Sequence, residues 1–458
     1  MRPPGARGTK IGGTAIAPSP YQAEGVLCFP GKGLHMGTAR IVFDRWHDRY
    51  ARRLDGVRSS AVRDLFAAAS RPDMISLSGG MPEVSRVPHD AVAHAARDAV
   101  RHEGAAALQY GSSNGRLQIR TLISELMAEI GVRLSPDDVL VTAGAQQALD
   151  LFAKTMLDPG DVVITEGPTY VGALQAFSAY EPDIHCIPMD GDGMRMDLLE
   201  AELARLGPRG AKFIYTIPNF QNPAGVTMSP ERRRRLLELA RAYDVLVVED
   251  DPYGRLRFDG GHMKPLRSLD DEVVYLGTFS KIFAPGLRLG WITAPAPVLA
   301  KVLLVKQAAD LCGSNFAQAT AERYFQGTRW RRVLAELTRT YAERRDAMVA
   351  ALEEHFPPEA RWTKPDGGFF VWVELPLYVD CSSMLAEAVE HGVTFVPGDG
   401  FFPDGRGKNC MRLAFCYAEP EAIGEGILRL AEVVEDRLEL YRAFAAAGAL
   451  PAREEGAA

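Results

Sequence analysis

Residues 274–291 read VYLGTFSKIFAPGLRLGW, an apolar run that stops at Gly277 and continues into a polar segment. The run Val274–Leu276 has no polar alternation, which is typical of a strand covered on both faces of a sheet. Four polar side chains follow it: Thr278, Ser280, Lys281 and Arg288. The stretch therefore predicts a buried strand whose end carries groups suited to chemistry.

The same pattern recurs on either side of this stretch. Residues 137–161, DDVLVTAGAQQALDLFAKTMLDPGD, predict a strand, a small-residue turn and a helix that ends before Pro159. Further apolar runs occur in DVVITEGPTY (161–170), IHCIPMD (184–190), KFIYTIPNF (212–220), VLVVEDDPYG (245–254) and LGWITAP (289–295). Strands that alternate with helices predict an α/β fold with a large doubly wound, mostly parallel sheet, and we expect seven strands.

The rest of the chain suggests a second, smaller domain. We expect the large domain over residues 80–330 and a small α+β domain over 331–446, because GGFFVWVEL, VTFVPG and CMRLAFCY have a different periodicity. Residues 36–79 predict an N-terminal arm and helix that pack with the small domain. Residues 1–35 are rich in Gly and Pro and predict a disordered leader, and residues 447–458 predict a frayed tail.

Composition excludes several classes of protein. The 458 residues are 47% hydrophobic and 24% charged, as in ordinary globular proteins, and the net charge of −7 disfavours binding to nucleic acid or anionic lipid. No run approaches the ~18 apolar residues of a membrane span, and the N-terminus lacks the apolar core of a signal peptide. Six cysteines without a CxxC pair indicate reduced thiols and no metal site, so we expect a cytoplasmic protein.

Polar residues at strand ends are the candidate site, because ligands of open α/β sheets bind at the carboxyl ends of the strands. TAGAQQ places Gly144, Ala145 and Gln146 at a helix start, where free N–H groups favour an anion. VLVVED ends on Asp250, and PNFQNPAG offers Asn222 before a Pro-Gly turn. Taken singly, each feature has an ordinary structural explanation as a turn, a cap or a surface group.

Taken together, these strand ends provide a lysine amine, a phosphate cradle, a carboxylate and phenol or amide donors. That set matches a pyridoxal 5′-phosphate site, where the cofactor's aldehyde needs a lysine and its ring nitrogen an acidic partner.

Over about residues 55–435 the chain resembles the fold-type-I, pyridoxal-phosphate-dependent aminotransferases of class I/II, and most closely the 2-aminoadipate, kynurenine and aromatic aminotransferase group. The segments that carry the resemblance are RSSAVRDL, SLSGGMPE, LQYGSSNG, TAGAQQALDLFAKTMLDPGD, EGPTYVGALQAF, PNFQNPAG, VVEDDPYG, GTFSKIFAPGLRLGW, GGFFVWVEL and MRLAFC. They stand in the family's order.

The resemblance implies a role for each candidate residue. Lys281 would form the internal aldimine and move the substrate proton as general base and acid, and Asp250 would keep the ring nitrogen protonated. Asn222 and Tyr253 would donate to the phenolic oxygen of the cofactor, and Tyr170 would stack on its ring. The residues implied to bind the phosphate are Gly144, Ala145, Gln146, Thr278, Ser280 and Arg288, with Tyr110 reaching it from the other subunit of a homodimer.

The resemblance also implies how substrates bind. Arg412 would grip the substrate α-carboxylate, Asn222 and Gly80 would line the same pocket, and Arg63 would meet a distal carboxylate. We expect a ping-pong reaction through pyridoxamine phosphate, with an L-amino acid as donor and 2-oxoglutarate as acceptor. The donor stays open between 2-aminoadipate, aromatic and branched-chain amino acids, since LCGSNFAQ (311–318) departs from the relatives.

Two other functions remain to be weighed. A β-lyase, decarboxylase or oxidase of the same fold would use the same Lys281 and Asp250. A ligand-sensing regulator would need roughly 60 upstream residues with the basic, three-helix pattern of a DNA-binding domain, and the Gly/Pro-rich leader does not have that pattern.

Overall fold

The computed structural model describes residues 44–56, 74–261 and 263–446. The chain divides into two units, residues 1–52 and 53–458, which we describe separately. The described residues of the first unit contain a 3-10 helix, η1 (His47–Arg49). Another 3-10 helix, η2 (Arg52–Gly56), begins at Arg52, the last residue of that unit.

Of the N-terminal arm and helix predicted over residues 36–79, the described residues 44–56 contain these short 3-10 helices, and Trp46, Tyr50 and Leu54 there are each about half exposed. The predicted helix and its packing with the small domain stay a prediction. Residues 57–73, the predicted leader and the predicted tail lie outside the described residues.

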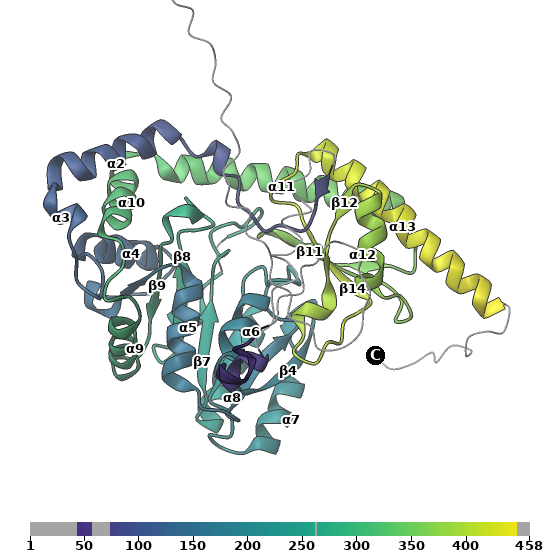
Figure 1. Ribbon diagram of the computed structural model, residues 1–458, viewed down its shortest axis with the longest axis horizontal. Coiled ribbons are helices and arrows are strands. Elements are labelled where there is room, and N and C mark those ends of the chain that lie inside the picture. The colour runs from purple at the N-terminus through teal and green to yellow at the C-terminus, as the bar shows by residue number, and fades with distance from the viewer. Residues whose placement is uncertain (1–43, 57–73, 262, 447–458) are drawn as a thin grey trace, which may run out of the picture. The chain divides into compact units, whose positions relative to one another are not determined.

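The second unit is built on an eight-stranded sheet, which confirms the predicted α/β class (Figure 1). The strands, in spatial order, are β2 (Leu140–Thr142), β9 (Gly290–Thr293), β8 (Val274–Thr278), β7 (Leu246–Asp250), β6 (Phe213–Thr216), β3 (Val162–Gly167), β4 (Asp183–Asp190) and β5 (Gly193–Met194). The central strands β8, β7, β6, β3 and β4 run parallel, whereas β9 is antiparallel to both of its neighbours. The predicted count of seven strands omits β5, a two-residue strand that pairs with β4 at the edge.

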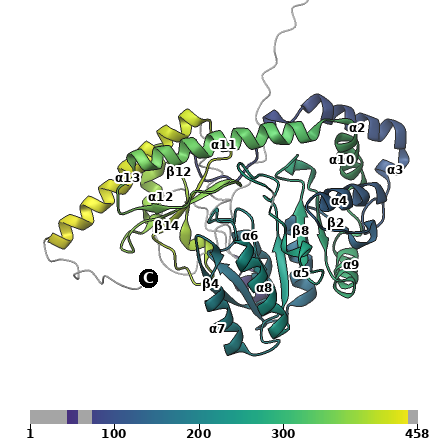
Figure 2. The same cartoon turned by 180° about the vertical axis from the view of Figure 1, so that it is seen from behind.

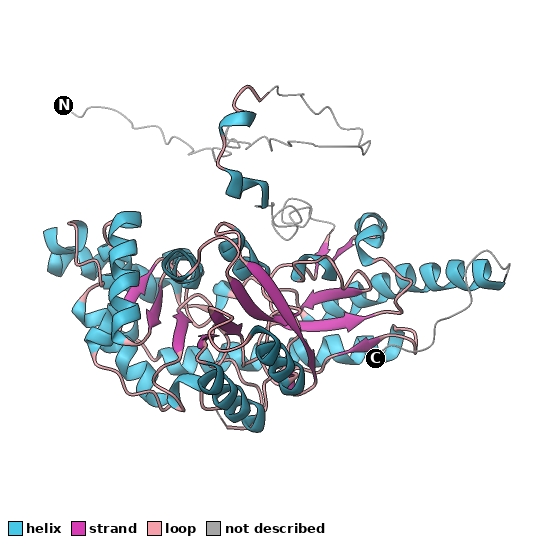
Figure 3. Ribbon diagram, turned by 90° about the horizontal axis from the view of Figure 1, so that it is seen from below, coloured by secondary structure: helices cyan, strands magenta, loops and turns pink. Residues whose placement is uncertain are grey.

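Helices cover both faces of this sheet, because its strands are apolar on both sides. One face packs against α5 (Ala145–Met156), α6 (Val171–Ser178) and α9 (Ala296–Asp310), and the other against α7 (Met196–Leu206) and α8 (Pro230–Tyr243). Figure 3 shows the strands between helices on either side. Side chains alternate accordingly along β6, where Phe213 and Tyr215 face α5 and α6 while Ile214 faces α7 and α8.

A helical layer lies near the β2 edge. It consists of α2 (His89–Glu103), α3 (Ala105–Leu108), α4 (Leu117–Glu129) and α10 (Asn315–Gly327), and α2 lies alongside α10. Three helices form one helical stretch after β9: α9, α10 and α11 (Trp330–His355). The first break is at Leu311, whose φ of 61° lies in the left-handed region and ends α9.

A smaller antiparallel sheet follows, with strands in the order β10 (Arg361–Trp362), β11 (Phe370–Glu374), β14 (Cys410–Ala414) and β13 (Val396–Pro397). It packs with α12 (Cys381–Glu390), α13 (Pro420–Ala446) and α11, which lies against α13 (Figure 2). An early segment joins this region, because β1 (Ile75–Ser76) pairs in parallel with β12 (Val393–Thr394). The exact limits of the two predicted domains, 80–330 and 331–446, stay a prediction.

Short 3-10 helices occur in the connections: η3 (Val84–Arg86), η4 (Pro136–Asp138), η5 (Leu266–Ser268), η6 (Pro285–Leu287) and η7 (Gly398–Phe401). None of the helices that the structure describes is long and apolar enough to cross a membrane.

Arg344 of α11 ties the early segment to the smaller sheet. Its side chain is fully buried and donates to the carboxylates of Glu83 and Glu419, at 2.9 and 2.7 Å. It also donates to the carbonyl of Cys416, just after β14, at 2.9 Å. One buried guanidinium therefore joins the segment that follows Gly80 to the segment that follows Arg412.

We expect Arg344→Ala to lower the free energy of unfolding by about 3–5 kcal/mol, because it leaves the mostly buried Glu83 without its cation. Arg332→Ala is the matched control on the same helix. The Arg332–Glu336 pair is exposed on both sides, so its loss should cost less than about 1 kcal/mol. Urea denaturation measures both values, and equal losses would contradict the central position of Arg344.

Candidate active site

Lys281 lies in the turn after β8, where the sequence predicted it. Its Nζ donates to the carbonyl of Gly80 at 2.8 Å and lies 5.3 Å from the centroid of the Phe369 ring. Burial lowers the pKa of Lys281 to about 8, and the positive charges of Arg412 and Arg288 act in the same direction. A larger share of the amine is therefore neutral near physiological pH than in an ordinary lysine, as a nucleophile requires.

Asp250 is the last residue of β7 and is only 3% exposed. Its Oδ2 accepts a hydrogen bond from the hydroxyl of Tyr215 at 2.8 Å, while its Oδ1 is buried without a partner among the described residues. Burial raises the pKa of Asp250 to about 7, the Tyr215 hydrogen bond opposes this rise, and the charge of Asp251 adds to it. A buried acceptor without a donor indicates a place for a donor from outside the polypeptide.

Arg412 lies on β14 of the smaller sheet, between β11 and β13, and is 3% exposed. Its Nη1 donates to Oδ1 of Asn222 at 3.0 Å and its Nη2 to the carbonyl of Ser78 at 2.8 Å, and its Nε has no partner among the described groups. Burial lowers the pKa of Arg412 to about 10, which leaves the guanidinium charged at neutral pH. The acceptors of Arg412 are neutral, and a planar guanidinium charge suits a carboxylate.

The predicted aromatic residues lie in the same region. Tyr253 is buried with its ring centroid 6.0 Å from that of Phe370, in an edge-on arrangement. Tyr170 is the N-cap residue of α6. Burial and the charge of Asp250 raise the pKa of Tyr170, while the charges of Arg412 and Arg288 oppose the rise. Groups from both sheets thus act on one phenol, which places them around a common space.

The turn before α5 is where the sequence predicted a phosphate cradle. Gly144 has a φ of +80°, and a Cβ built there would lie 2.5 Å from Nη2 of Arg288, so glycine lets the arginine approach the backbone. The Nη2 of Arg288 donates to the carbonyl of Ala143 at 3.2 Å. The N–H of Ala143 donates to Gln147, whose amide donates to Asp310 at 2.8 Å. The turn is therefore held in shape by its own hydrogen bonds.

Ala145 and Gln146 begin α5, whose first turn has no side-chain cap. Across from them the hydroxyl of Thr278 donates to that of Ser280 at 2.9 Å and accepts from its N–H at 3.1 Å. Helix N–H groups, hydroxyls and a guanidinium are the donors that an anion needs.

The other predicted residues differ in their placement. Gly80 touches the site through its carbonyl, and a Cβ there would lie 2.7 Å from the ring of Phe370. Tyr110 follows α3 and is 78% exposed, so its predicted role depends on a second subunit. Arg63 lies outside the described residues.

Sequence reasoning missed a second layer of residues. Tyr215 on β6 is the only donor to the Asp250 carboxylate among the described residues. Glu166, at 1% exposure on β3, accepts from Thr216, from the N–H of Ile217 and from Gln221, which also donates to the carbonyl of Pro168. A charged residue inside the apolar run VVITEG was the available signal for Glu166. For Tyr215 there was none, since a tyrosine in a buried strand looks like core.

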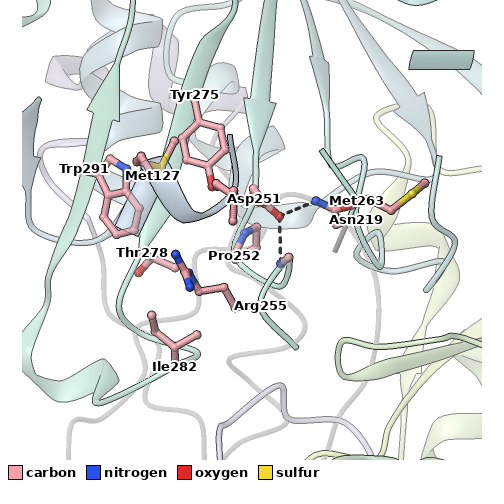
Figure 4. A pocket seen from close by; sticks show the side chains of 12 residues that line it. Met127, Asn219, Asp251, Pro252, Arg255, Met263, Tyr275, Thr278, Ile282 and Trp291 are labelled. Atoms are coloured by element: carbon pink, nitrogen blue, oxygen red, sulfur yellow. Dashed lines mark hydrogen bonds between the residues drawn. The ribbon is translucent and has the colours of Figure 1, made fainter. Parts of the chain in front are cut away.

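A separate pocket lies next to this space, beside Asp251 (Figure 4). The carboxylate of Asp251 accepts from Asn219, from the N–H of Gly254 and from the hydroxyl of Tyr275, at 2.9 to 3.0 Å. Neither Lys281 nor Asp250 lines the pocket, although Thr278 does. The Asp251 carboxylate therefore has three hydrogen-bond donors from the chain, whereas one oxygen of the Asp250 carboxylate has none among the described residues.

These features fit pyridoxal phosphate. The orphan Oδ1 of Asp250 is an acceptor for a protonated ring nitrogen. The missing Cβ of Gly144 lets the guanidinium of Arg288 lie close to the start of α5, so that donors suited to a phosphate come together there. Lys281 supplies an amine of lowered pKa. No group of His, Cys, Asp and Glu suited to hold a metal ion occurs among the described residues.

Comparisons with known proteins agree with this fit. Residues 72–430 match the family model described as aminotransferase class I and II. The chain is 45% identical over 388 residues to the aromatic-amino-acid aminotransferase 1 of Thermococcus litoralis, covering 84% of this chain and 93% of that one. It is 37% identical over 400 residues to the 2-aminoadipate transaminase of Thermus thermophilus, covering 86% and 98%.

Among solved structures, the kynurenine aminotransferase of Pyrococcus horikoshii, in complex with PMP, superposes with a TM-score of 0.82 at 42% identity. The match covers 86% of this chain and 98% of that one. The alpha-aminoadipate aminotransferase of T. thermophilus, complexed with N-(5′-phosphopyridoxyl)-L-leucine, gives a TM-score of 0.80 at 36% identity, covering 86% and 99%.

We expect Asp250→Asn to change the pH dependence of stability in the cofactor-free protein. Burial raises the pKa of Asp250 to about 7, as it does for Glu166 and Glu249. A carboxyl whose pKa rises on folding stabilises the protein at low pH and loses that effect as the pH climbs toward about 7. Between about pH 5 and 7 the free energy of unfolding should therefore fall less steeply in the variant, by about 1.4 kcal/mol per pH unit.

Urea denaturation across this pH range measures the slope. Asp192→Asn, which removes one carboxylate from the surface, is the control for net charge. A variant with the parent's slope would show that Asp250 is not titrating in this range.

Proposed function

Because the chain belongs to the class I and II aminotransferases, which use pyridoxal phosphate, we propose that it moves the amino group of an L-amino acid to a 2-oxo acid by a ping-pong reaction. We further propose 2-oxoglutarate as the acceptor. The observation that carries the proposal is that Lys281, Asp250 and Arg412 all lie near the phenols of Tyr170 and Tyr253, while Asp250 Oδ1 is left without a partner among the described residues.

When bound, pyridoxal phosphate supplies an aldehyde that combines with amines and a ring that withdraws electrons from the substrate Cα. Lys281 then has two tasks, to hold the cofactor covalently and to take and return the proton at the substrate Cα. A pKa of about 8 suits both, because the amine accepts a proton near neutral pH and gives it back.

Asp250 holds the proton of the ring nitrogen. Its unpartnered Oδ1 is the acceptor, and its ionised form is the useful one because a negative charge favours a protonated ring nitrogen. We propose that Asn222 and Tyr253 donate to the phenolic oxygen of the cofactor and that Tyr170 covers its ring. The turn at Gly144 and the side chains of Thr278, Ser280 and Arg288 are assigned to the phosphate.

Arg412 orients the substrate. Its two Nη atoms are fixed by Asn222 and Ser78, so a carboxylate bound to the guanidinium has a defined direction. Fixing the α-carboxylate sets which bond at Cα stands perpendicular to the ring plane. The choice of the Cα–H bond makes transamination, and not decarboxylation, the expected outcome.

The amino donor is proposed from the relatives, whose names specify aromatic amino acids, 2-aminoadipate and kynurenine. Branched-chain amino acids remain in the proposal. Arg63, outside the described residues, is proposed to meet a distal carboxylate.

A homodimer is proposed as the functional unit. Tyr110 and Leu108 are 78% and 68% exposed, and Leu311, which accepts a hydrogen bond from Ser113, is 56% exposed. Large side chains exposed together are typical of an interface. We also propose a cytoplasmic location, since all of the described cysteines are free thiols.

The proposed reaction is tested by a panel of L-amino acids assayed against 2-oxoglutarate with the purified holoenzyme. We expect aromatic amino acids or 2-aminoadipate to convert the bound cofactor to its amino form without an acceptor, and 2-oxoglutarate to reverse the change. Parallel double-reciprocal lines would accompany a ping-pong reaction.

Lys281→Ala should lose both the visible absorbance of the lysine-bound cofactor and the activity. Lys301→Ala, at an exposed lysine on α9, is the control. Release of ammonia, carbon dioxide or hydrogen peroxide in place of reversible conversion would favour a lyase, a decarboxylase or an oxidase.

Tyr110 should act in the neighbouring subunit. We expect Tyr110→Ala to weaken cofactor binding about tenfold or more, since it removes a hydrogen bond to a charged group. Mixed dimers of Tyr110→Ala and Lys281→Ala subunits should regain activity, because one of their two sites then has both residues intact. Mixed dimers as inactive as the parent variants would place Tyr110 in its own subunit's site or outside any site.

A further inference from the structure

We propose that Tyr215 is a positioning residue for Asp250, whose hydroxyl holds one carboxylate oxygen and directs the other toward the ring nitrogen of the cofactor. The inference rests on the proposed role of Asp250 and adds a residue that the sequence did not single out. It concerns the orientation and the charge of a carboxylate and involves no contact between Tyr215 and the substrate.

The sheet register brings the two side chains together. Tyr215 on β6 is paired with Val248 on β7, and Asp250 follows two residues later on the same face. The hydroxyl of Tyr215 reaches Oδ2 of Asp250 at 2.8 Å. Oδ1 is then the only oxygen of this carboxylate without a donor among the described residues.

The Tyr215 ring is held by other aromatic rings. Tyr215 is fully buried, and the ring of Phe177 on α6 meets it edge-on at a centroid distance of 5.4 Å. Phe177 packs on Phe213 at 5.4 Å, and Phe213 on Phe152 of α5 at 5.1 Å. α5 begins at the phosphate cradle and α6 at Tyr170, so the same two helices fix the cofactor's surroundings and the tyrosine.

The hydroxyl of Tyr215 acts as the hydrogen-bond donor to Asp250. Burial and the negative charge of Asp250 raise the pKa of Tyr215 well above its ordinary value, so the phenol stays protonated. A donor favours the ionised carboxylate. The other titratable groups that act directly on Tyr215 are Tyr170 and Glu166, and the other one that acts on Asp250 is Asp251; none of these three carries a positive charge. The cations Arg412 and Arg288 act on the neighbouring phenol of Tyr170. Tyr215 therefore helps to keep the shared proton on the ring nitrogen instead of on Asp250.

The chain contains a matched control on the other side of β7. Tyr275 on β8 donates to Oδ2 of Asp251 at 3.0 Å, and it too is almost fully buried (Figure 4). Tyr275→Phe removes the same hydroxyl from the adjacent carboxylate, which Asn219 and Gly254 continue to satisfy. Each of the two substitutions thus removes one buried hydroxyl that donates to a carboxylate, and only Tyr215→Phe removes a donor of Asp250.

The experiment compares holoenzymes reconstituted with pyridoxal phosphate labelled with 15N in its ring. In the parent and in Tyr275→Phe, we expect the ring-nitrogen resonance of a protonated pyridine. In Tyr215→Phe it should shift toward the neutral form at the same pH, and kcat should fall about 10- to 100-fold, as expected when a charged group loses a hydrogen bond. A Tyr215→Phe enzyme with the parent's resonance and the kcat of Tyr275→Phe would overturn the inference.

Two further variants separate the possible failures. If Asp250→Asn leaves the resonance unchanged, the proposed role of Asp250 is overturned together with this inference. If Asp250→Asn moves the resonance and Tyr215→Phe does not, only the inference is overturned. Should Tyr215→Phe fail to fold, 3-fluorotyrosine at position 215, a stronger donor, should move the resonance toward the protonated form, and no movement would count against the role of Tyr215.

Discussion

The removal of charge from water is the constraint on which this structure depends. Asp250, Lys281 and Arg412 all have pKa values displaced by burial, each in the direction of its neutral form. Their hydrogen bonds within the chain compensate this only in part, since Asp250 Oδ1 and Arg412 Nε remain without partners. A buried charge that is incompletely paired is unfavourable. The polypeptide alone is therefore less stable at this point than it would be with a ligand of complementary charge.

The charged groups of the candidate site come from both sheets. Parallel strands of the large sheet carry Asp250 and lead into Lys281, while the antiparallel smaller sheet carries Arg412. Asn222 connects them, because it belongs to the segment after β6 and accepts from Arg412. Behind this layer, Tyr215 and Glu166 fix the backbone and the carboxylate from within the core. Such a second layer is what sets the direction of the residues in front of it.

The continuous apolar runs predicted the central strands, and the rule that ligands bind at strand ends predicted Lys281, Asp250 and Asn222 as neighbours. The features that could not be predicted from the sequence depend on long-range pairing or on backbone conformation. The pairing of Ile75 with Val393 has no local signal, nor has the left-handed Leu311 that divides the helical stretch. Tyr215 looked like an ordinary core residue, because only the register with β7 shows that its hydroxyl meets a carboxylate. Whether the predicted site residues act as assigned remains a prediction.

The hydrogen bond from Lys281 to Gly80 has a mechanical consequence. Gly80 follows a segment whose backbone bonds run to the smaller sheet, from Leu77 to Thr394 and from Ala414 to Leu77. The hydrogen bond thus ties the Lys281 amine to the element that carries Arg412, although the backbone of Lys281 follows β8 of the large sheet. The acceptor of the amine and the guanidinium therefore belong to one hydrogen-bonded element, so a displacement of that element moves both, and the amine follows for as long as its hydrogen bond to Gly80 holds.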